Sequence, residues 1–245
     1  MNLSGGLTIS GGLSIVTEAS AGVVSSGLVF NLQSAPSSGT TWTDASGNGY
    51  NGTLQGSASY SSANGGGIKL NNSTASGGTD YISVPYNISS NTVTVEVVAS
   101  FNPTSYWATI WGNEVYSSGR GYYAYMATST GITYGKPNSS SSESLTASNA
   151  IRQWIFVING TTQSLYLNGS QVGASDTVTG QTLFASSEFL FGARHTNAGT
   201  GTTDKMNNST VANQPVYYQM RVYNKALSTS EITQNYNAMK TTYGI

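Results

Sequence analysis

The chain has 245 residues, of which 8% are charged, and its 9 Lys and Arg against 10 Asp and Glu give a net charge of −1. This balance offers no basic surface for nucleic acid, and zero Cys and a single His exclude thiolate chemistry and a His-rich zinc site. No run of about 18 apolar residues occurs, so no membrane-spanning helix is expected.

The rest of the composition favours an all-β fold. Ser, Thr, Asn and Gly favour turns and strand edges over helices, while 16 Tyr and 4 Trp supply enough burial to order the chain. Because sandwiches of this length often form one domain, we expect a single antiparallel two-sheet sandwich.

Residues 1–27 are expected to form a glycine-rich arm and linker outside the sandwich. Two six-residue repeats open the chain, each with two apolar residues on one face of an extended strand. They are Leu7 and Ile9 in the first repeat and Leu13 and Ile15 in the second. Residues 1–20 lack the basic start and apolar block of a signal peptide. Two interpretations stay open, a flexible leader or an arm that adds strands to a neighbouring subunit.

From residue 28 onward, short apolar runs roughly 10 residues apart predict the strands of a sandwich. The predicted strands cover residues 28–32, 68–70, 81–84, 92–101, 106–111, 122–126, 154–158, 164–167, 170–173, 188–193 and 216–223. The Asn-Gly pairs at 159–160 and 168–169 predict tight hairpin turns, because a type I′ turn needs positive φ at both central positions. Residues 138–148 are predicted to be a solvated loop. Residues 194–215 are predicted to be a long surface excursion or a contact loop.

Alternation predicts which side chains face the core. In residues 92–101, the odd-numbered positions from Val93 to Phe101 share one face. In residues 216–223, the predicted core side chains are Tyr218, Met220 and Val222.

One helix is predicted at the C-terminal end. Ser228 and Glu231 have the spacing of a capping box, and Gly244 stands where a C-cap is expected. The apolar residues at steps of three and four are Ile232, Tyr236, Met239 and Tyr243. We expect this amphipathic helix to pack beside the sandwich and close a sheet edge.

Four stretches resemble sequence motifs of a known family. Residues 44–53 read DASGNGYNGT, residues 80–85 read DYISVP, residues 94–101 read TVEVVASF and residues 221–232 read RVYNKALSTSEI. In this order, residues 28–245 resemble the concanavalin A-like, laminin-G-like jelly rolls. The resemblance implies two antiparallel sheets, one of them concave, with ligand loops at one rim.

The ending QNYNAMKTTYGI, residues 234–245, is similar to the terminus of such domains in tailed-phage virion proteins. The glycine-rich start resembles that of phage structural proteins. The resemblance implies a multicopy protein on the virion surface that contacts other virion proteins through its arm.

The resemblance also raises the question of a structural calcium ion, which several relatives hold with acidic residues just before the last-strand motif. This chain has Tyr217–Met220 there, without an acid. Asp44 and Asp80 are the best remaining carboxylates for Ca²⁺, which takes about six to eight oxygen ligands. The favoured alternative for Asp44 is an Asx-turn that needs no metal, so no cofactor is expected.

A dense group of aromatic residues is the best candidate for a glycan or subunit contact, because exposed rings often mark an interface. Tyr123 and Tyr125 share the strand face opposite Tyr122 and Met126. The full candidate set is Trp111, Tyr123, Tyr125, His195, Tyr217 and Arg221. Whether these residues bind a sugar, contact a subunit or lie under a loop stays open.

No enzyme is expected. Related jelly-roll glucanases carry close-set carboxylates on one strand, because hydrolysis needs an acid and a nucleophile or base about 5 to 9.5 Å apart. Glu96 is the one carboxylate on its strand, and Glu114 is isolated. His195 is predicted to be a solvated loop residue, without a G-x-S-x-G motif to suggest a nucleophile.

The sequence thus predicts an all-β, concanavalin A-like jelly roll with one C-terminal helix and a glycine-rich N-terminal arm. Its predicted role is a virion structural protein, a capsid decoration or tail-fibre component. The alternative is a lectin-like module that binds host glycans, and a β-glucan hydrolase is the least favoured reading.

Overall fold

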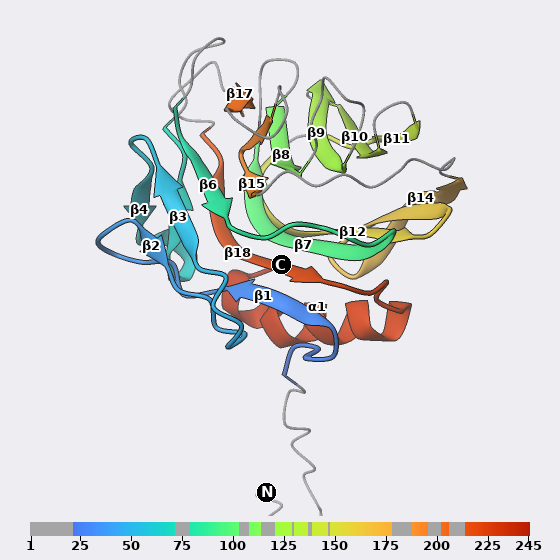
Figure 1. Cartoon of the computed structure of the whole chain (residues 1–245), viewed down its shortest axis with the longest axis horizontal. Helices are drawn as coiled ribbons and strands as arrows, with labels where there is room; N and C mark the ends of the chain where they lie inside the picture. Colours follow the sequence, from blue (N-terminus) through green and yellow to red (C-terminus); the bar gives the residue numbers. More distant parts are fainter. Residues whose placement is uncertain are drawn as a thin grey trace, which may run out of the picture.

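The structure, a computed structural model, describes residues 22–71, 79–102, 108–113, 121–128, 130–136, 139–146, 148–177, 188–195, 202–205 and 214–245. Two antiparallel sheets lie face to face, and one helix covers the outer side of one of them (Figure 1). The predicted all-β jelly-roll sandwich with a C-terminal helix is confirmed. The described part of the chain contains no helix with the length and apolar character needed to cross a membrane.

Within the described residues, sheet A has eight strands. In spatial order they are β14 (Ser170–Thr177), β13 (Thr162–Leu167), β12 (Ser148–Asn159), β7 (Thr92–Phe101), β18 (Val216–Tyr223), β5 (Gly67–Lys69) and β4 (Ser59–Ser61), with β1 (Leu28–Leu32) also paired to β18. A 3₁₀ turn, η1 (Ala63–Gly65), joins β4 to β5.

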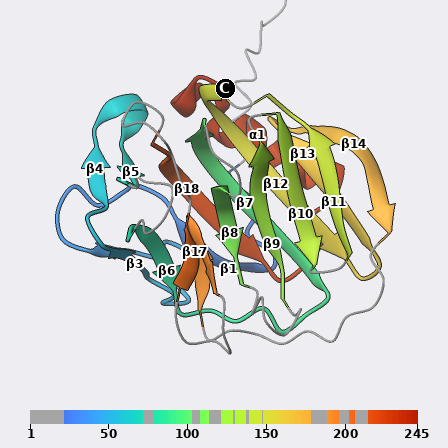
Figure 2. The same ribbon diagram turned by 90° about the horizontal axis from the view of Figure 1, so that it is seen from above.

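Sheet B also has eight strands in the described residues and lies across sheet A (Figure 2). In spatial order they are β11 (Ser139–Ser144), β10 (Gly131–Lys136), β9 (Tyr123–Thr128), β8 (Ala108–Gly112), β15 (Phe189–Phe191), β6 (Tyr81–Val84), β3 (Gly52–Gln55) and β2 (Thr41–Trp42). A separate two-stranded ribbon joins β16 (Ala193–His195) to β17 (Thr202–Lys205).

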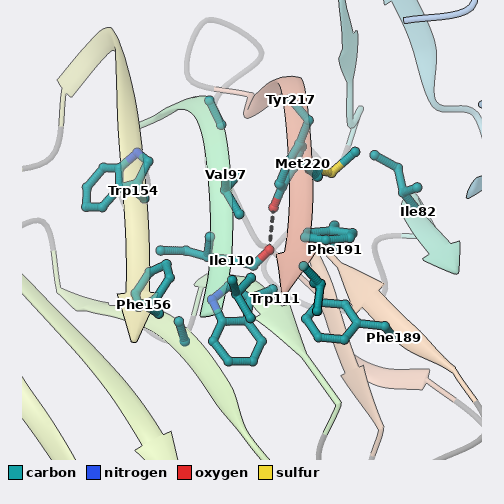
Figure 3. Close-up of a cluster of buried hydrophobic side chains, with 14 of the residues drawn as sticks. Ile82, Val97, Ile110, Trp111, Trp154, Phe156, Phe189, Phe191, Tyr217 and Met220 are labelled. Carbon is teal, nitrogen blue, oxygen red and sulfur yellow. Dashed lines mark hydrogen bonds between the residues drawn. The ribbon is translucent and has the colours of Figure 1, made fainter. Parts of the chain in front are cut away.

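The main hydrophobic core fills the space between the two sheets. The predicted alternation of β7 is confirmed, because its odd-numbered residues from Val93 to Phe101 are at most 1% exposed and belong to this core. Aromatic rings from both sheets meet there, as with Trp111 of β8 and Phe156 of β12, whose ring centroids lie 5.5 Å apart (Figure 3). Burial of such large apolar surfaces is the dominant favourable term for folding.

The helix α1 (Thr229–Tyr243) begins and ends as the sequence predicts. Ser228 and Glu231 form the capping box, and Gly244 adopts the left-handed conformation at the C-cap. Its position differs from the prediction, because α1 lies across the outer face of sheet A rather than along a sheet edge (Figure 1). Ile232 packs with Ile155 of β12 in one apolar cluster, and Met239 belongs to a second.

A buried polar network joins α1 to the outer face of sheet A. The Arg221 Nη1 of β18 donates to Glu96 Oε1 of β7 at 3.1 Å, and both residues are 1% exposed. Gln153 Nε2 donates to the same oxygen at 2.8 Å, and Asn235 Nδ2 of α1 donates to Glu96 Oε2 at 2.7 Å. The remaining amide oxygen of Asn235 accepts from the backbone N–H of Val24 at 2.8 Å.

This last contact joins a residue of the expected linker to the folded body. The expected linker extended to residue 27, but Val24 is 5% exposed and packs in the same cluster as Ile232. The described residues before β1 therefore belong to the folded body. The predicted arm residues Leu7, Ile9, Leu13 and Ile15 lie outside the described residues.

Most predicted strands are confirmed, with corrections in polar segments. Strands β1, β6, β7 and β18 have the predicted bounds. The expected loop 138–148 contains β11, which pairs along its length with the unpredicted β10. The expected long loop 194–215 contains β17, whose partner strand holds His195.

We expect Glu96→Gln to lower the free energy of unfolding by about 3–5 kcal/mol, because the buried Arg221 charge would lose its partner. The matched control is Glu231→Gln, which breaks the partly exposed Lys225–Glu231 pair, with side chains 30% and 26% exposed. Since Gln can also occupy the N3 position of a capping box, the control should lower the free energy of unfolding by less than about 1 kcal/mol. Urea unfolding of both variants is the measurement, and equal losses would contradict the structural role given to Glu96.

Candidate functional site

Two of the predicted glycan residues lie in the core. Trp111 and Tyr217 have no exposed surface. Trp111 stacks on Phe189 with centroids 5.4 Å apart, and the Tyr217 hydroxyl donates to the Ile110 carbonyl at 2.7 Å (Figure 3). Neither ring is accessible to a sugar, so both assignments are wrong.

β-Bulges explain this error. The pairing of β18 with β7 shifts between Tyr217 and Gln219, which inserts one residue and reverses the alternation. Tyr217 therefore faces the core together with Met220, while Tyr218, a predicted core residue, lies in the cluster under α1. A second shift precedes Trp111 in β8. The register of a bulged strand is set by its partner and cannot be read from alternation.

Tyr123 and Tyr125 lie on the outer face of sheet B, opposite the core residues Tyr122 and Met126, as the alternation predicts. They are, however, only 7% and 8% exposed. Their rings stack on each other with centroids 5.3 Å apart, and the Arg194 guanidinium lies 5.9 Å from the Tyr125 ring centroid. These rings are buried in the structure and present no open face to a sugar.

His195 and Arg221 are also buried. His195 is 2% exposed in β16, with Nε2 at 3.4 Å from the Glu188 carbonyl, so the predicted solvated loop position is wrong. Arg221 belongs to the network under α1, far in sequence from the aromatic pair on β9. The structure thus does not bring the six predicted residues together into one site.

The two calcium candidates each have their oxygens engaged by protein donors. Asp44 accepts from the backbone N–H groups of Asn31, Ser46 and Tyr50, all within 3.0 Å, and from the Ser46 hydroxyl. The favoured Asx-turn is therefore present at Asp44. Asp80 accepts from the backbone and hydroxyl of Ser57 and from the backbone N–H of Asn71. No group of three or more metal-ligating side chains occurs among the described residues.

A pocket of about 330 Å³ opens where four segments meet, and we call it the tyrosine pocket. Its lining residues are Leu28 and Val29 of β1, Asn48 and Tyr50 of the loop before β3, Tyr86 after β6 and Asn224 after β18. The two tyrosine rings are half-buried and meet edge to face, with centroids 5.3 Å apart. Both asparagines are exposed.

The sequence of the loop before β3 fixes the positions of Asn48 and Tyr50 in the pocket. Gly47 and Gly49 have φ of +87° and +81°, which favour glycine, and they fold the loop back onto β1. Asn48 Nδ2 then donates to the carbonyls of Val29 at 2.8 Å and Leu28 at 3.2 Å, which leaves its Oδ1 for a ligand. The carboxylate of Asp44 holds the Tyr50 backbone, so this loop is fixed before any ligand binds.

Tyr86 is fixed from the other side. Its ring packs edge to face on Phe30, with centroids 6.1 Å apart, and its backbone N–H donates to the Val84 carbonyl at 2.7 Å. Burial first, and the neighbouring Tyr50 second, raise the pKa of Tyr86 above that of a free tyrosine. Its hydroxyl is thus protonated at neutral pH and can donate a hydrogen bond.

This arrangement suits a small hydroxylated ligand. The ring faces offer apolar contact, and the amide and phenol groups offer directional hydrogen bonds. Ligand pockets commonly combine apolar walls with a few polar groups that orient the ligand. None of the described lining residues carries a formal charge. The pocket therefore has the chemistry of a site for a neutral sugar.

Sequence reasoning missed these residues although they adjoin the family motifs. Tyr50 and Asn48 stand inside DASGNGYNGT, where the sequence predicts a functional role for Asp44 alone, and Tyr86 follows the DYISVP stretch directly. A signal was available, since aromatic residues in predicted loops are candidates for binding. Their convergence is visible only in three dimensions.

Comparison with known proteins gives a family and a fold. Residues 76–233 match the model of the concanavalin A-like lectin/glucanases superfamily. A search of curated protein sequences found no significant match.

Among solved structures, the binding domain of botulinum neurotoxin DC in complex with SialylT matches with a TM-score of 0.66 and 13% identity, covering 88% of this chain and 52% of that one. The serotype D binding domain matches at 0.64 and 15%, covering 87% and 52%. A structure of type C, whose cell entry is dependent upon interaction with two ganglioside molecules, matches at 0.66 and 12%, covering 87% and 51%. The chain thus spans about half the length of these structures, and the likeness shows the shared fold.

We expect Asp44→Ala to lower the free energy of unfolding by about 2 kcal/mol, because three backbone N–H groups lose their acceptor. The control is Asp176→Ala, a half-buried carboxylate on the edge strand β14, which should change stability by under about 0.5 kcal/mol. Chemical denaturation measures both. Millimolar Ca²⁺ should leave the midpoint of the parent protein unchanged, and a large calcium-dependent shift would contradict the Asx-turn assignment.

Proposed function

Because the chain belongs to the concanavalin A-like lectin/glucanases superfamily, we propose that it is a glycan-binding module whose site is the tyrosine pocket. The observation that carries the proposal is the juxtaposition of two half-buried tyrosine rings with two exposed asparagine amides in one preformed pocket. A volume of about 330 Å³ suits a single sugar residue at the end or branch of a glycan.

The electrostatics support a neutral sugar as the bound unit. No described lining residue is charged, and the whole chain is only 8% charged, so little long-range attraction for charged ligands is available. Affinity must then come from ring contact and hydrogen bonds, which favours recognition of hydroxyl orientation.

We propose binding without catalysis, although the family includes glucanases. Hydrolysis of a glycosidic bond requires two carboxyl groups beside the sugar, and no described residue lining the tyrosine pocket has one. Glu96, the carboxylate of β7, is 1% exposed and receives hydrogen bonds from Arg221, Gln153 and Asn235.

We expect Tyr50→Ala to weaken glycan binding about tenfold, because an aromatic contact of roughly 1.4 kcal/mol is lost. Ligands would first be identified on a glycan array, and dissociation constants of the best neutral glycan then measured by calorimetry. Tyr60→Ala is the matched control, since Tyr60 is 40% exposed on β4 and outside the pocket. Tyr50→Phe should retain most of the affinity. Unchanged binding by Tyr50→Ala would sink this assignment of the site.

A second measurement tests the absence of catalysis. The protein would be incubated with β-glucans and reducing ends assayed over time. We expect no release above a heat-inactivated sample, and steady release would overturn the proposal of a binding module.

The setting we propose for this module is the surface of a tailed-phage particle, in several copies. Two resemblances support it, that of residues 234–245 to the ends of phage virion domains and that of the glycine-rich start to phage structural proteins. In this setting, residues 3–15 of the glycine-rich arm anchor the protein to other virion proteins and the sandwich binds host glycans.

Deletion of residues 3–15 should abolish incorporation into particles while leaving the thermal unfolding midpoint unchanged, because the contacts of Val24 with α1 remain. Particles produced with the truncated protein would be purified and probed for it by immunoblot. Normal incorporation would contradict the anchoring role.

A further inference from the structure

A second cavity, on the helix side of sheet A, is separate from the tyrosine pocket. It has a volume of about 390 Å³ and lies between the C-terminal half of α1, the end of β1 and the middle of β18. Its polar lining residues are Gln33, Ser34, Gln219, Arg221, Thr242 and Tyr243. We call it the helix-side cavity.

The floor of this cavity holds a charged group with unused donors. Arg221 is 1% exposed, and its Nε donates to Asn31 Oδ1 and its Nη1 to Glu96 Oε1, both at 3.1 Å. No hydrogen bond joins its Nη2 to any group in the described part of the chain. A guanidinium presents five N–H donors, so the two on Nη2 remain for a ligand in a cavity that Arg221 lines.

The mouth of the cavity carries neutral polar groups. Gln33, Ser34 and Thr242 are exposed, whereas Gln219 and Met239 at the floor are 5% and 3% exposed. Gln33 Oε1 accepts from Gln219 Nε2 at 3.2 Å, which leaves the Gln33 amide N–H groups free to donate. Burial raises the pKa of Tyr243, so its hydroxyl stays protonated at neutral pH.

We propose that the helix-side cavity binds the carboxylate of a small acidic ligand, of the size and hydroxylation of a hexuronate sugar. The carboxylate accepts from Arg221 Nη2, and the sugar hydroxyls meet the groups at the mouth. Among the described residues that line the cavity, Arg221 is the one with a formal charge. A charge-assisted hydrogen bond in a partly desolvated cavity is roughly twice as strong as a neutral one.

A single negative charge fits the site better than a dianion. The Glu96 Oε1 lies 3.1 Å from Arg221 Nη1 and already balances the charge of the guanidinium. Every further negative charge on the ligand is therefore repelled by Glu96 without a second cation to offset it. This favours a carboxylate over a phosphate monoester. The proposal concerns a different cavity and does not depend on the tyrosine pocket.

The test is saturation-transfer NMR on the full chain with glucuronate and, as the neutral match, methyl glucoside. We expect glucuronate to bind saturably at the helix-side cavity and methyl glucoside not to compete with it. Acetate should compete and acetamide should not, because they differ in charge while sharing size and shape. Equal effects of acetate and acetamide would overturn the proposal.

Two variants locate the site without touching the buried ion pair. Thr242→Trp fills the mouth and should weaken glucuronate binding at least about tenfold. Thr241→Trp places the same ring on the neighbouring exposed residue outside the cavity and should bind like the parent protein. Thr242→Trp that retains binding, or a parent protein that does not bind glucuronate, would overturn the proposal. Tyr50→Ala should leave glucuronate binding intact, which separates this test from that of the tyrosine pocket.

Discussion

The buried ion pair between Arg221 and Glu96 constrains everything on the helix side of the molecule. Removing two charges from water costs several kcal/mol each unless their hydrogen-bonding groups are engaged. Here Glu96 receives donors from three side chains, one of which, Asn235, belongs to α1. Because a helix places a given side chain at one height and one angle, this contact defines where α1 lies on sheet A. The same Asn235 holds Val24, so the entry of the chain into β1 depends on it as well.

The inner and outer faces of sheet A are packed differently. Apolar packing is concentrated between the two sheets, where β7 contributes one row of side chains. The other row of β7 supplies Glu96 to the network under α1. The two faces of one strand thus serve different purposes, one excluding water and the other orienting the helix. Because hydrogen bonds have preferred directions, this buried polar network adds specificity that a purely apolar face would lack.

Both candidate binding sites lie at the ends of β1. The tyrosine pocket contacts Leu28 and the helix-side cavity contacts Gln33, which an extended chain separates by about 17 Å. Their chemistries differ, since the first has no charged lining residue and the second has Arg221 at its floor.

The sequence alone determined the sandwich, the bounds of β7 and β18, and the capped helix α1, because alternation, turn chemistry and capping act over a few neighbouring residues. It did not reveal β11, whose serine-rich side chains carry no apolar pattern and whose strand exists through pairing with β10. Nor did it place Tyr217 in the core, because a bulge against β7 reverses the alternation there. Only the tertiary structure decided that residues as distant as Asn48, Tyr86 and Asn224 line one pocket. The physical reason is that strand register and loop convergence depend on contacts between segments far apart in the chain, which local patterns do not encode.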